Sequence, residues 1–244
     1  MSLLTNLISY WKLDEDSGNA VDSHGSNTLT ASSSPGSAAG KVGNARTFNG
    51  TNQSFSVASN ASLAVGDIDF TISAWLFIGD KSENRSAVAM WNFSANKRQF
   101  SLGYDSSADR YRFLVSANGT LAAAAQVEAN ILGSPPINTW SHLVAWHDSA
   151  SNTINIQANN GIVNTVSHSA GVFASDSPLN ISSFLGTAEL WSGSLDEVGF
   201  WKRVLTSSER SELHNSGSGL AYPFSTGNQT GNLNNTIRNV RHAL

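Results

Sequence analysis

The sequence contains no cysteine, so disulfide bonds, thiolate metal sites and cysteine nucleophiles are all excluded. Charged residues are also scarce, at 13% of the 244 residues, which is about half the usual fraction. Ser, Thr, Asn and Gly take their place. Such a chain must be stabilised by its apolar core and its backbone hydrogen bonds. The uncharged polar composition is typical of adhesin-like, extracellular or virus-particle proteins.

A basic excess and a long apolar run are missing as well. The net charge is −4, so the sequence predicts no nucleic-acid partner. No apolar run approaches the roughly 20 residues that span a bilayer, so we expect no membrane partner. The first ten residues lack the basic and apolar parts of a signal peptide, and we expect no export by that route. A removed signal, another export pathway or release inside a virus particle would each fit.

Short apolar or alternating runs recur between clusters of Gly, Asn, Asp, Ser and Pro, which is the pattern of an antiparallel β-sandwich. Since sandwiches reach roughly 200–250 residues as one domain, we expect a single all-β domain over residues 1–224. The expected strands are Leu7–Leu13, Ala45–Phe48, Ser54–Val57, Phe70–Ile78, Ser86–Phe93, Gln99–Tyr104, Arg110–Val115, Thr120–Val127, Ser141–His147, Thr153–Ala158, Ile162–Ser167, Asn180–Leu185 and Ser194–Trp201.

Three segments allow finer predictions. Apolar residues occupy both faces of Phe70–Ile78, which indicates a central strand covered on both sides. The triplet Asn159-Asn160-Gly161 predicts a tight hairpin in which the glycine, at the second central position, takes the positive φ. The low-complexity segment Ala31–Gly40 predicts a flexible surface loop.

Two segments have helical patterns. Thr206 and Glu209 form a capping box, which predicts a helix that runs to about Asn215, stops at Gly217 and covers one edge of the sandwich. Residues 225–244 form a polar linker and an amphipathic tail. We expect this tail to dock on its own sandwich or, preferably, on a neighbouring subunit, because the linker lets it reach away. The apolar stripe of the tail consists of Leu233, Ile237, Val240 and Leu244.

Six motifs follow one another along the chain. They are Tyr10–Glu15, Gly40–Gly50, Phe70–Trp75, Trp140–Val144, Ile156–Gly161 and Trp191–Trp201. In this order they resemble the concanavalin A-like lectin/glucanase superfamily, and within it the laminin-G-like and pentraxin-like domains of bacterial and phage surface proteins. The resemblance covers roughly Leu7 to Phe224 and implies a two-sheet antiparallel jelly-roll sandwich. It says less about function, because this fold hosts lectins, glycosidases, adhesion modules and structural spacers.

The resemblance also implies a structural calcium ion near the first strand and the Asp-Glu strand. Matched residue by residue, its ligands would be Asp22, Asn49 and Asp196, whose alternative role is to cap turns. Sugar binding would need aromatic side chains together on an exposed sheet face.

The aromatic candidates are Trp91, Tyr104 and Tyr111, which could meet on one sheet face, although core packing is the ordinary role of each.

The motifs of catalysis are missing. Glycosidases of this superfamily have a Glu-x-Asp-x-x-Glu strand that places two carboxylates on one face, and this sequence has none. Asp196 and Glu197 are adjacent, so on a regular strand they point to opposite faces. No Gly-x-Ser-x-Gly turn or His-x-x-x-His pair is present, and His142 fits a hydrogen-bonded core position. We therefore expect no enzymatic activity.

Together these observations predict a non-enzymatic surface module with a binding or structural role. The favoured setting is the surface of a phage virion, as a capsid decoration or tail-fibre protein with glycan-binding adhesion. Its partners would be neighbouring capsid, tail or identical subunits, and glycans. The alternative is an extracellular protein, either a secreted carbohydrate-binding module or a glycan-active enzyme of the same fold.

Overall fold

A computed structural model describes residues 2–224. The predicted tail helix with Leu233, Ile237, Val240 and Leu244 lies outside the described residues, as does the predicted linker. The boundary between sandwich and tail therefore stays a prediction.

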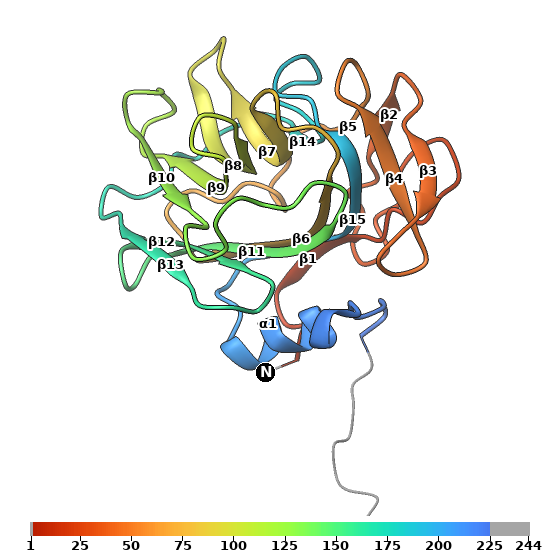
Figure 1. Cartoon of the computed structure of the whole chain (residues 1–244). Helices are drawn as coiled ribbons and strands as arrows, with labels where there is room; N and C mark the ends of the chain where they lie inside the picture. Colours follow the sequence, from red (N-terminus) through yellow and green to blue (C-terminus); the bar gives the residue numbers. More distant parts are fainter. Residues whose placement is uncertain (1, 225–244) are drawn as a thin grey trace, which may run out of the picture.

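The chain forms two antiparallel β-sheets that face each other, with a short helix beneath one of them (Figure 1). This confirms the predicted two-sheet sandwich. The eight-stranded sheet has the order β13-β12-β11-β6-β15-β4-β3, with β1 paired to β15. Its strands are β1 (Leu7–Trp11), β3 (Gly36–Ala39), β4 (Asn44–Asn49), β6 (Phe70–Ile78), β11 (Trp140–Asp148), β12 (Thr153–Ala158), β13 (Asn164–Ser167) and β15 (Ser192–Trp201).

The seven-stranded sheet has the order β10-β9-β8-β7-β14-β5-β2. The strands are β2 (Thr30–Ser32), β5 (Ser54–Val57), β7 (Arg85–Asn92), β8 (Lys97–Asp105), β9 (Arg110–Ser116), β10 (Ala124–Glu128) and β14 (Leu179–Ile181).

The main core fills the space between the sheets because strand residues alternate between the inner and outer faces. On β6, Ala74 and Leu76 point into this core, and Phe70 packs against Phe100 and Phe113 of the opposite sheet. Since β6 lies between β11 and β15 and nearly all of its residues are buried, it is the central strand that its sequence predicts.

The predicted flexible loop Ala31–Gly40 is wrong. The end of β2 and the whole of β3 lie in it, with Ala31 opposite Phe55 and Ala38 opposite Ala45. Both strands are at sheet edges, so backbone hydrogen bonds hold them without large apolar side chains. Their Ser- and Ala-rich sequence therefore lacks the usual strand pattern.

The predicted hairpin turn is present but uses different residues. The N–H of Gly161 donates to the C=O of Ala158 at 2.9 Å, so Asn159 and Asn160 are the two central residues. Both asparagines have positive φ, at 50° and 53°. Asparagine tolerates this conformation better than most residues, which leaves the glycine outside the strained positions.

The helix α1 (Ser207–His214) begins as predicted. Thr206 accepts from the Glu209 N–H, the Glu209 side chain returns to the Thr206 N–H, and Asn215 ends the helix in the left-handed conformation. A short 3₁₀ turn, η1 (Asn215–Gly217), follows. The helix covers the outer face of the eight-stranded sheet rather than one edge of the sandwich.

Three contacts show this placement. The Arg210 guanidinium lies over the ring of Trp146 and bonds Gln157, and His214 stacks on Trp75. Trp75 belongs to β6 and Trp146 to β11, and both side chains lie on the outer face of the sheet.

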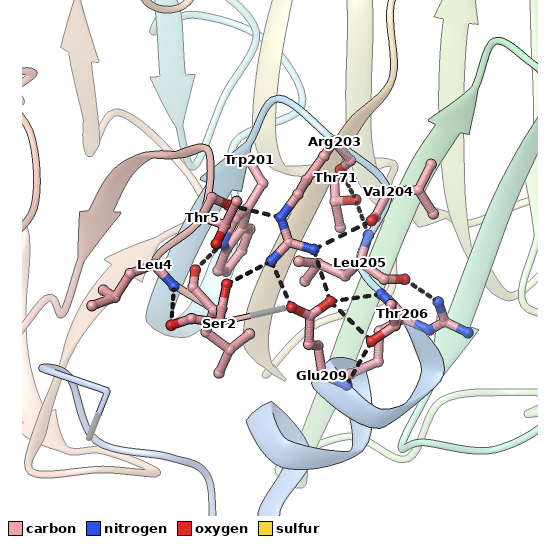
Figure 2. Close-up of polar contacts among 12 residues, drawn as sticks. Ser2, Leu4, Thr5, Thr71, Trp201, Arg203, Val204, Leu205, Thr206 and Glu209 are labelled. Atoms are coloured by element: carbon pink, nitrogen blue, oxygen red, sulfur yellow. Dashed lines mark hydrogen bonds and ion pairs between the residues drawn. The ribbon is translucent and has the colours of Figure 1, made fainter. Parts of the chain in front are cut away.

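A buried ion pair anchors α1 to the start of the chain (Figure 2). Arg203 donates to both carboxylate oxygens of Glu209, at 2.7 and 2.8 Å, and to the backbone C=O groups of Thr5 and Ser2. A second apolar cluster surrounds this network and brings the two ends of the described chain together. It consists of Leu3, Leu7, Tyr10, Trp201, Leu205, Leu213 and Phe224.

Candidate functional site

The two sheets differ in what covers their outer faces. The helix α1 and the N-terminal segment lie against the eight-stranded sheet, whereas the described residues place no helix over the seven-stranded sheet (Figure 1). Functional side chains are therefore best sought on the outer side of β7, β9 and β10. We call this surface the outer β9 face. It consists of Trp91, Arg112, Leu114, Gln126, Glu128, Phe184 and Glu189.

Strand alternation builds this face. On β9, Phe113 and Val115 enter the main core, so Arg112 and Leu114 point outward. On β10, Val127 is in the core, so its neighbours Gln126 and Glu128 also point outward, opposite Leu114 and Arg112. The two strands thus place two pairs of unlike side chains side by side.

One half of the face is apolar. The rings of Trp91 and Phe184 stack with centroids 5.8 Å apart and planes 26° from parallel. Leu114 and Ala89 pack with them, and the partly buried Ala124 and Ala188 extend the cluster toward solvent. Trp91 is only 3% exposed, so the surface of this patch is aliphatic and its aromatic rings form the floor.

The other half is polar and rigid. Arg112 donates to Asp105 at 2.8 Å and to both oxygens of Glu189 at 3.1 and 3.0 Å. Burial raises the pKa of Glu189, and the Arg112 charge opposes that rise. On the next strand, Gln126 donates to Glu128 at 2.7 Å. Paired side chains of this kind keep fixed directions for their remaining hydrogen-bonding positions.

An apolar patch beside oriented carboxylate and amide groups suits a small polar ligand with one hydrophobic side. Sugar rings have this character, because their C–H groups form an apolar surface while their hydroxyl groups both donate and accept hydrogen bonds. Gln126, Glu128 and Glu189 are half-buried and therefore reachable from solvent.

The three aromatic residues proposed from the sequence do not share a face. Trp91 lies on the outer β9 face, but Tyr104 and Tyr111 are inside the main core, where their rings meet edge-on at 6.4 Å. The expected common surface is wrong, because Tyr104 follows the inward positions Phe100 and Leu102 on the same strand.

Sequence reasoning missed Arg112, Phe184 and Glu189. Arg112 stands between two core residues of β9, so alternation alone could have identified it as an outward position. Phe184 and Glu189 follow β14 outside any named strand, and no pattern in the sequence places them beside Trp91 and Arg112.

The three proposed calcium ligands each cap a separate turn. Asp22 accepts from the backbone N–H groups of Tyr10, His24, Gly25 and Asn27, at 2.8 to 3.1 Å.

The other two proposed ligands, Asn49 and Asp196, each cap a different turn. Asn49 accepts from the N–H groups of Thr51 and Asn52, while Asp196 accepts from those of Lys41 and Val42. Between residues 2 and 224, no three His, Asp or Glu side chains are grouped so as to hold a metal ion. The donor set therefore does not fit one shared calcium site.

Asp196 and Glu197 lie where β15 departs from regular geometry. The pairing of β15 with β6 shifts between Asp196 and Gly199, and Glu197 has a φ of 49°. Leu195 and Val198 both enter the core, so this bulge leaves the two acids together on the outer side. The expectation that they point to opposite faces is wrong for this reason.

Both acids are buried, at 0% and 3% exposed. Burial raises the pKa of Asp196 to about 7 and that of Glu197 to about 8. Asp196 Oδ1 and both Glu197 oxygens lack a well-formed hydrogen bond from residues 2–224. By contrast, His142 has the hydrogen-bonded core position expected of it, with Nε2 at 2.8 Å from the Ser73 hydroxyl.

None of the helices formed by residues 2–224 has the length and apolar character needed to span a membrane.

Comparison with solved structures gives fold relatives of low sequence identity. The binding domain of Paraclostridial mosquitocidal protein 1 matches 88% of this chain and 53% of its own, with 17% identity and a TM-score of 0.69. This chain thus spans about half of that structure. Domain 4 of AbnA, an extracellular arabinanase from Geobacillus stearothermophilus solved with arabinotriose, matches 88% and 98%, with 13% identity and a TM-score of 0.63.

A third relative is botulinum neurotoxin type C, whose cell entry is described as dependent on interaction with two ganglioside molecules. It matches 88% of this chain and 52% of its own, with 12% identity and a TM-score of 0.66. No curated protein sequence matches the chain.

Comparison of the sequence with models of protein families identifies the family of this chain. The laminin-G-type model described as "Concanavalin A-like lectin/glucanases superfamily" matches residues 49–209, which is well over half of the chain. This protein therefore belongs to the concanavalin A-like lectin/glucanases superfamily, in its laminin-G-like branch.

Proposed function

We propose that this protein is a non-enzymatic glycan-binding module that uses its outer β9 face, carried on a virion surface as a capsid decoration or tail-fibre protein, or secreted. The observation that carries the proposal is the join between the Trp91–Phe184 apolar patch and the Arg112–Glu189 ion pair. A relative adds support, since domain 4 of the arabinanase was solved with arabinotriose, a neutral sugar.

The charges of the site favour a neutral sugar. Asp105, Glu128 and Glu189 outnumber the two outward arginines of β9, Arg110 and Arg112, and the protein as a whole carries a net charge of −4. A sugar with a carboxylate would meet like charge here, whereas hydroxyl groups can both donate to the carboxylates and accept from Gln126.

The proposal is tested by binding of arabinotriose and of a panel of neutral and sialylated oligosaccharides to the intact protein, by titration calorimetry or NMR. We expect neutral members to bind and Glu128→Ala to weaken that binding about tenfold or more, since hydrogen bonds to charged groups are worth about 1.5–3 kcal/mol. The matched control is Glu212→Ala, which makes the same change on the exposed side of α1.

Two results would overturn the proposal. One is binding that Glu128→Ala and Glu212→Ala weaken equally, because the site would then lie elsewhere. The other is the appearance of new reducing ends when the protein is incubated with the same oligosaccharides, since that would make it an enzyme.

A further inference from the structure

The strand β13 ends the eight-stranded sheet with an unpaired edge. It pairs with β12 on one side, with Val166 opposite Ile154 and Asn164 opposite Ile156, and it is the last strand in the sheet order (Figure 1). An edge of this kind presents backbone N–H and C=O groups that another strand can bind.

The direction of these groups follows from one hydrogen bond. The N–H of His168 donates to the C=O of Asn152 at 2.7 Å, which makes these two residues a hydrogen-bonded pair. Because such pairs alternate along antiparallel strands, Val166 and Asn164 also bond β12. The N–H and C=O groups of Thr165 and Ser167 therefore point outward, and no other backbone group between residues 2 and 224 bonds them.

This edge lacks the features that normally block pairing with another chain. Residues 149–175 contain no Asp, Glu, Lys, Arg or Pro. Edge strands are commonly protected by a charged side chain or a proline, which makes approach of a second strand costly. Two copies of this neutral edge would meet without repulsion between like charges.

Exposed apolar side chains flank the same edge. Ile162 is 71% exposed, Ile131 54% and Val166 38%. The N–H of Ile131 bonds the side chain of Asn164 at 3.3 Å, so the loop that carries Ile131 lies directly beside β13. These side chains add apolar area that four-residue strands alone would not provide.

We propose that β13 is a self-association surface that pairs antiparallel with β13 of a second copy about a two-fold axis at Val166. In this register Thr165 faces Ser167 of the second copy, and each such pair exchanges both N–H···O bonds. The two Val166 side chains meet across the axis, and Ile131 and Ile162 lie beside them. Each copy therefore contributes the same patch of residues to the interface. The two eight-stranded sheets become continuous.

The test is the mass of the full-length protein in solution, measured over a concentration series by sedimentation equilibrium. We expect a species of twice 25.9 kDa. Val166→Lys places like charges opposite each other at the axis and should weaken the dimer by about tenfold or more. The matched control is Val21→Lys, because Val21 is also exposed and lies far from β13 in the sequence.

Mixing Val166→Lys with Val166→Glu separates loss of the interface from loss of the fold. Opposite charges at the axis should restore a mixed dimer, which misfolded variants could not form. A protein that remains monomeric up to about millimolar concentration, or a dimer that Val166→Lys leaves intact, would overturn the proposal. So would failure of the mixed variants to associate while each retains the native circular dichroism spectrum.

Discussion

Asp196 and Glu197 are carboxyl groups that folding removes from water without a donor for every oxygen. Burial therefore favours the protonated form and raises the pKa of Asp196 to about 7 and that of Glu197 to about 8. A group whose pKa is higher in the folded protein than in the unfolded chain binds protons more tightly when folded. Its contribution is greatest at low pH and is lost as pH rises through the folded pKa.

We expect the free energy of unfolding to fall as pH rises from about 6.5 to about 8 and to level off above that, because ionising these two buried acids destabilises the fold. The measurement is urea denaturation at a series of pH values. In Asp196→Asn with Glu197→Gln this decrease should largely disappear, since neither replacement ionises. An equal slope in the wild type and the double variant would contradict the prediction.

The buried His142 gives the free energy of unfolding the opposite pH dependence. The measurement therefore starts above the unfolded pKa of histidine, near 6.5. Burial lowers the pKa of His142 to about 3, so its contribution is full above the unfolded pKa near 6.5 and is lost as pH falls. A decline in stability on acidification therefore comes from His142 together with acids whose pKa the fold lowers, such as Asp109 and Glu209, whereas a decline above pH 6.5 reports Asp196 and Glu197.

Single residues of the site show what the sequence can reveal. The inward direction of Tyr104 follows from its spacing to Phe100 and Leu102, which was available from the sequence. The pairing of Glu189 with Arg112 joins residues 77 positions apart, through a loop whose path no local pattern encodes. Alternation identifies the face of a strand residue, but only the packed fold supplies its neighbours.

At the scale of an element, α1 depends on contacts outside itself. It spans only eight residues, and helices this short are marginal without tertiary support. The Arg203–Glu209 pair supplies that support and also bonds the backbone of Ser2 and Thr5 (Figure 2). One guanidinium thus joins the first residues, the last long strand and the helix.

Arg203→Lys should lower the free energy of unfolding by about 2–4 kcal/mol, because an ammonium group cannot make the two-point contact with Glu209 and also reach both carbonyls. Chemical denaturation measures the change. The control is Lys97→Ala, which removes a surface ion pair with Asp176 and should cost less than about 1 kcal/mol. Equal losses in the two variants would show that burial of the Arg203 pair contributes nothing.

Elements with strong local signals were predicted closely. Ser54–Val57, Phe70–Ile78 and Thr153–Ala158 have the predicted bounds, because turn residues bracket their apolar runs. β2 and β3 were missed, since edge strands of Ser and Ala are stabilised by their neighbours' backbones and not by their own side chains. The turn after β12 was predicted with Gly161 at a central position, but Asn159 and Asn160 occupy the two central positions with positive φ. The presence of a turn was therefore easier to predict than which residues occupy its central positions.

On the scale of the whole molecule, one core joins the two sheets. Phe70 of β6 packs on Phe100 and Phe113 of the other sheet, with centroids 5.4 and 6.1 Å away. Neither sheet can bury its inner face alone, so the two should unfold together. The order of the strands within the sheets could not be predicted, because it depends on contacts between distant segments.

We expect a single thermal transition with equal calorimetric and van't Hoff enthalpies. Phe70→Ala should lower the stability of this one transition by about 3–5 kcal/mol without dividing it. Phe93→Ala is the control, since Phe93 is 43% exposed and its removal should change stability much less. Two resolved transitions in either variant would show that the sheets unfold independently.

The cluster that contains both Leu3 and Phe224 has a practical consequence. The first and last described residues emerge next to each other beneath the eight-stranded sheet, on the side opposite to the outer β9 face (Figure 1). A fluorescent tag, a surface linker or a scaffold attached at Ser2 or directly after Phe224 would therefore leave the outer β9 face directed away from the support.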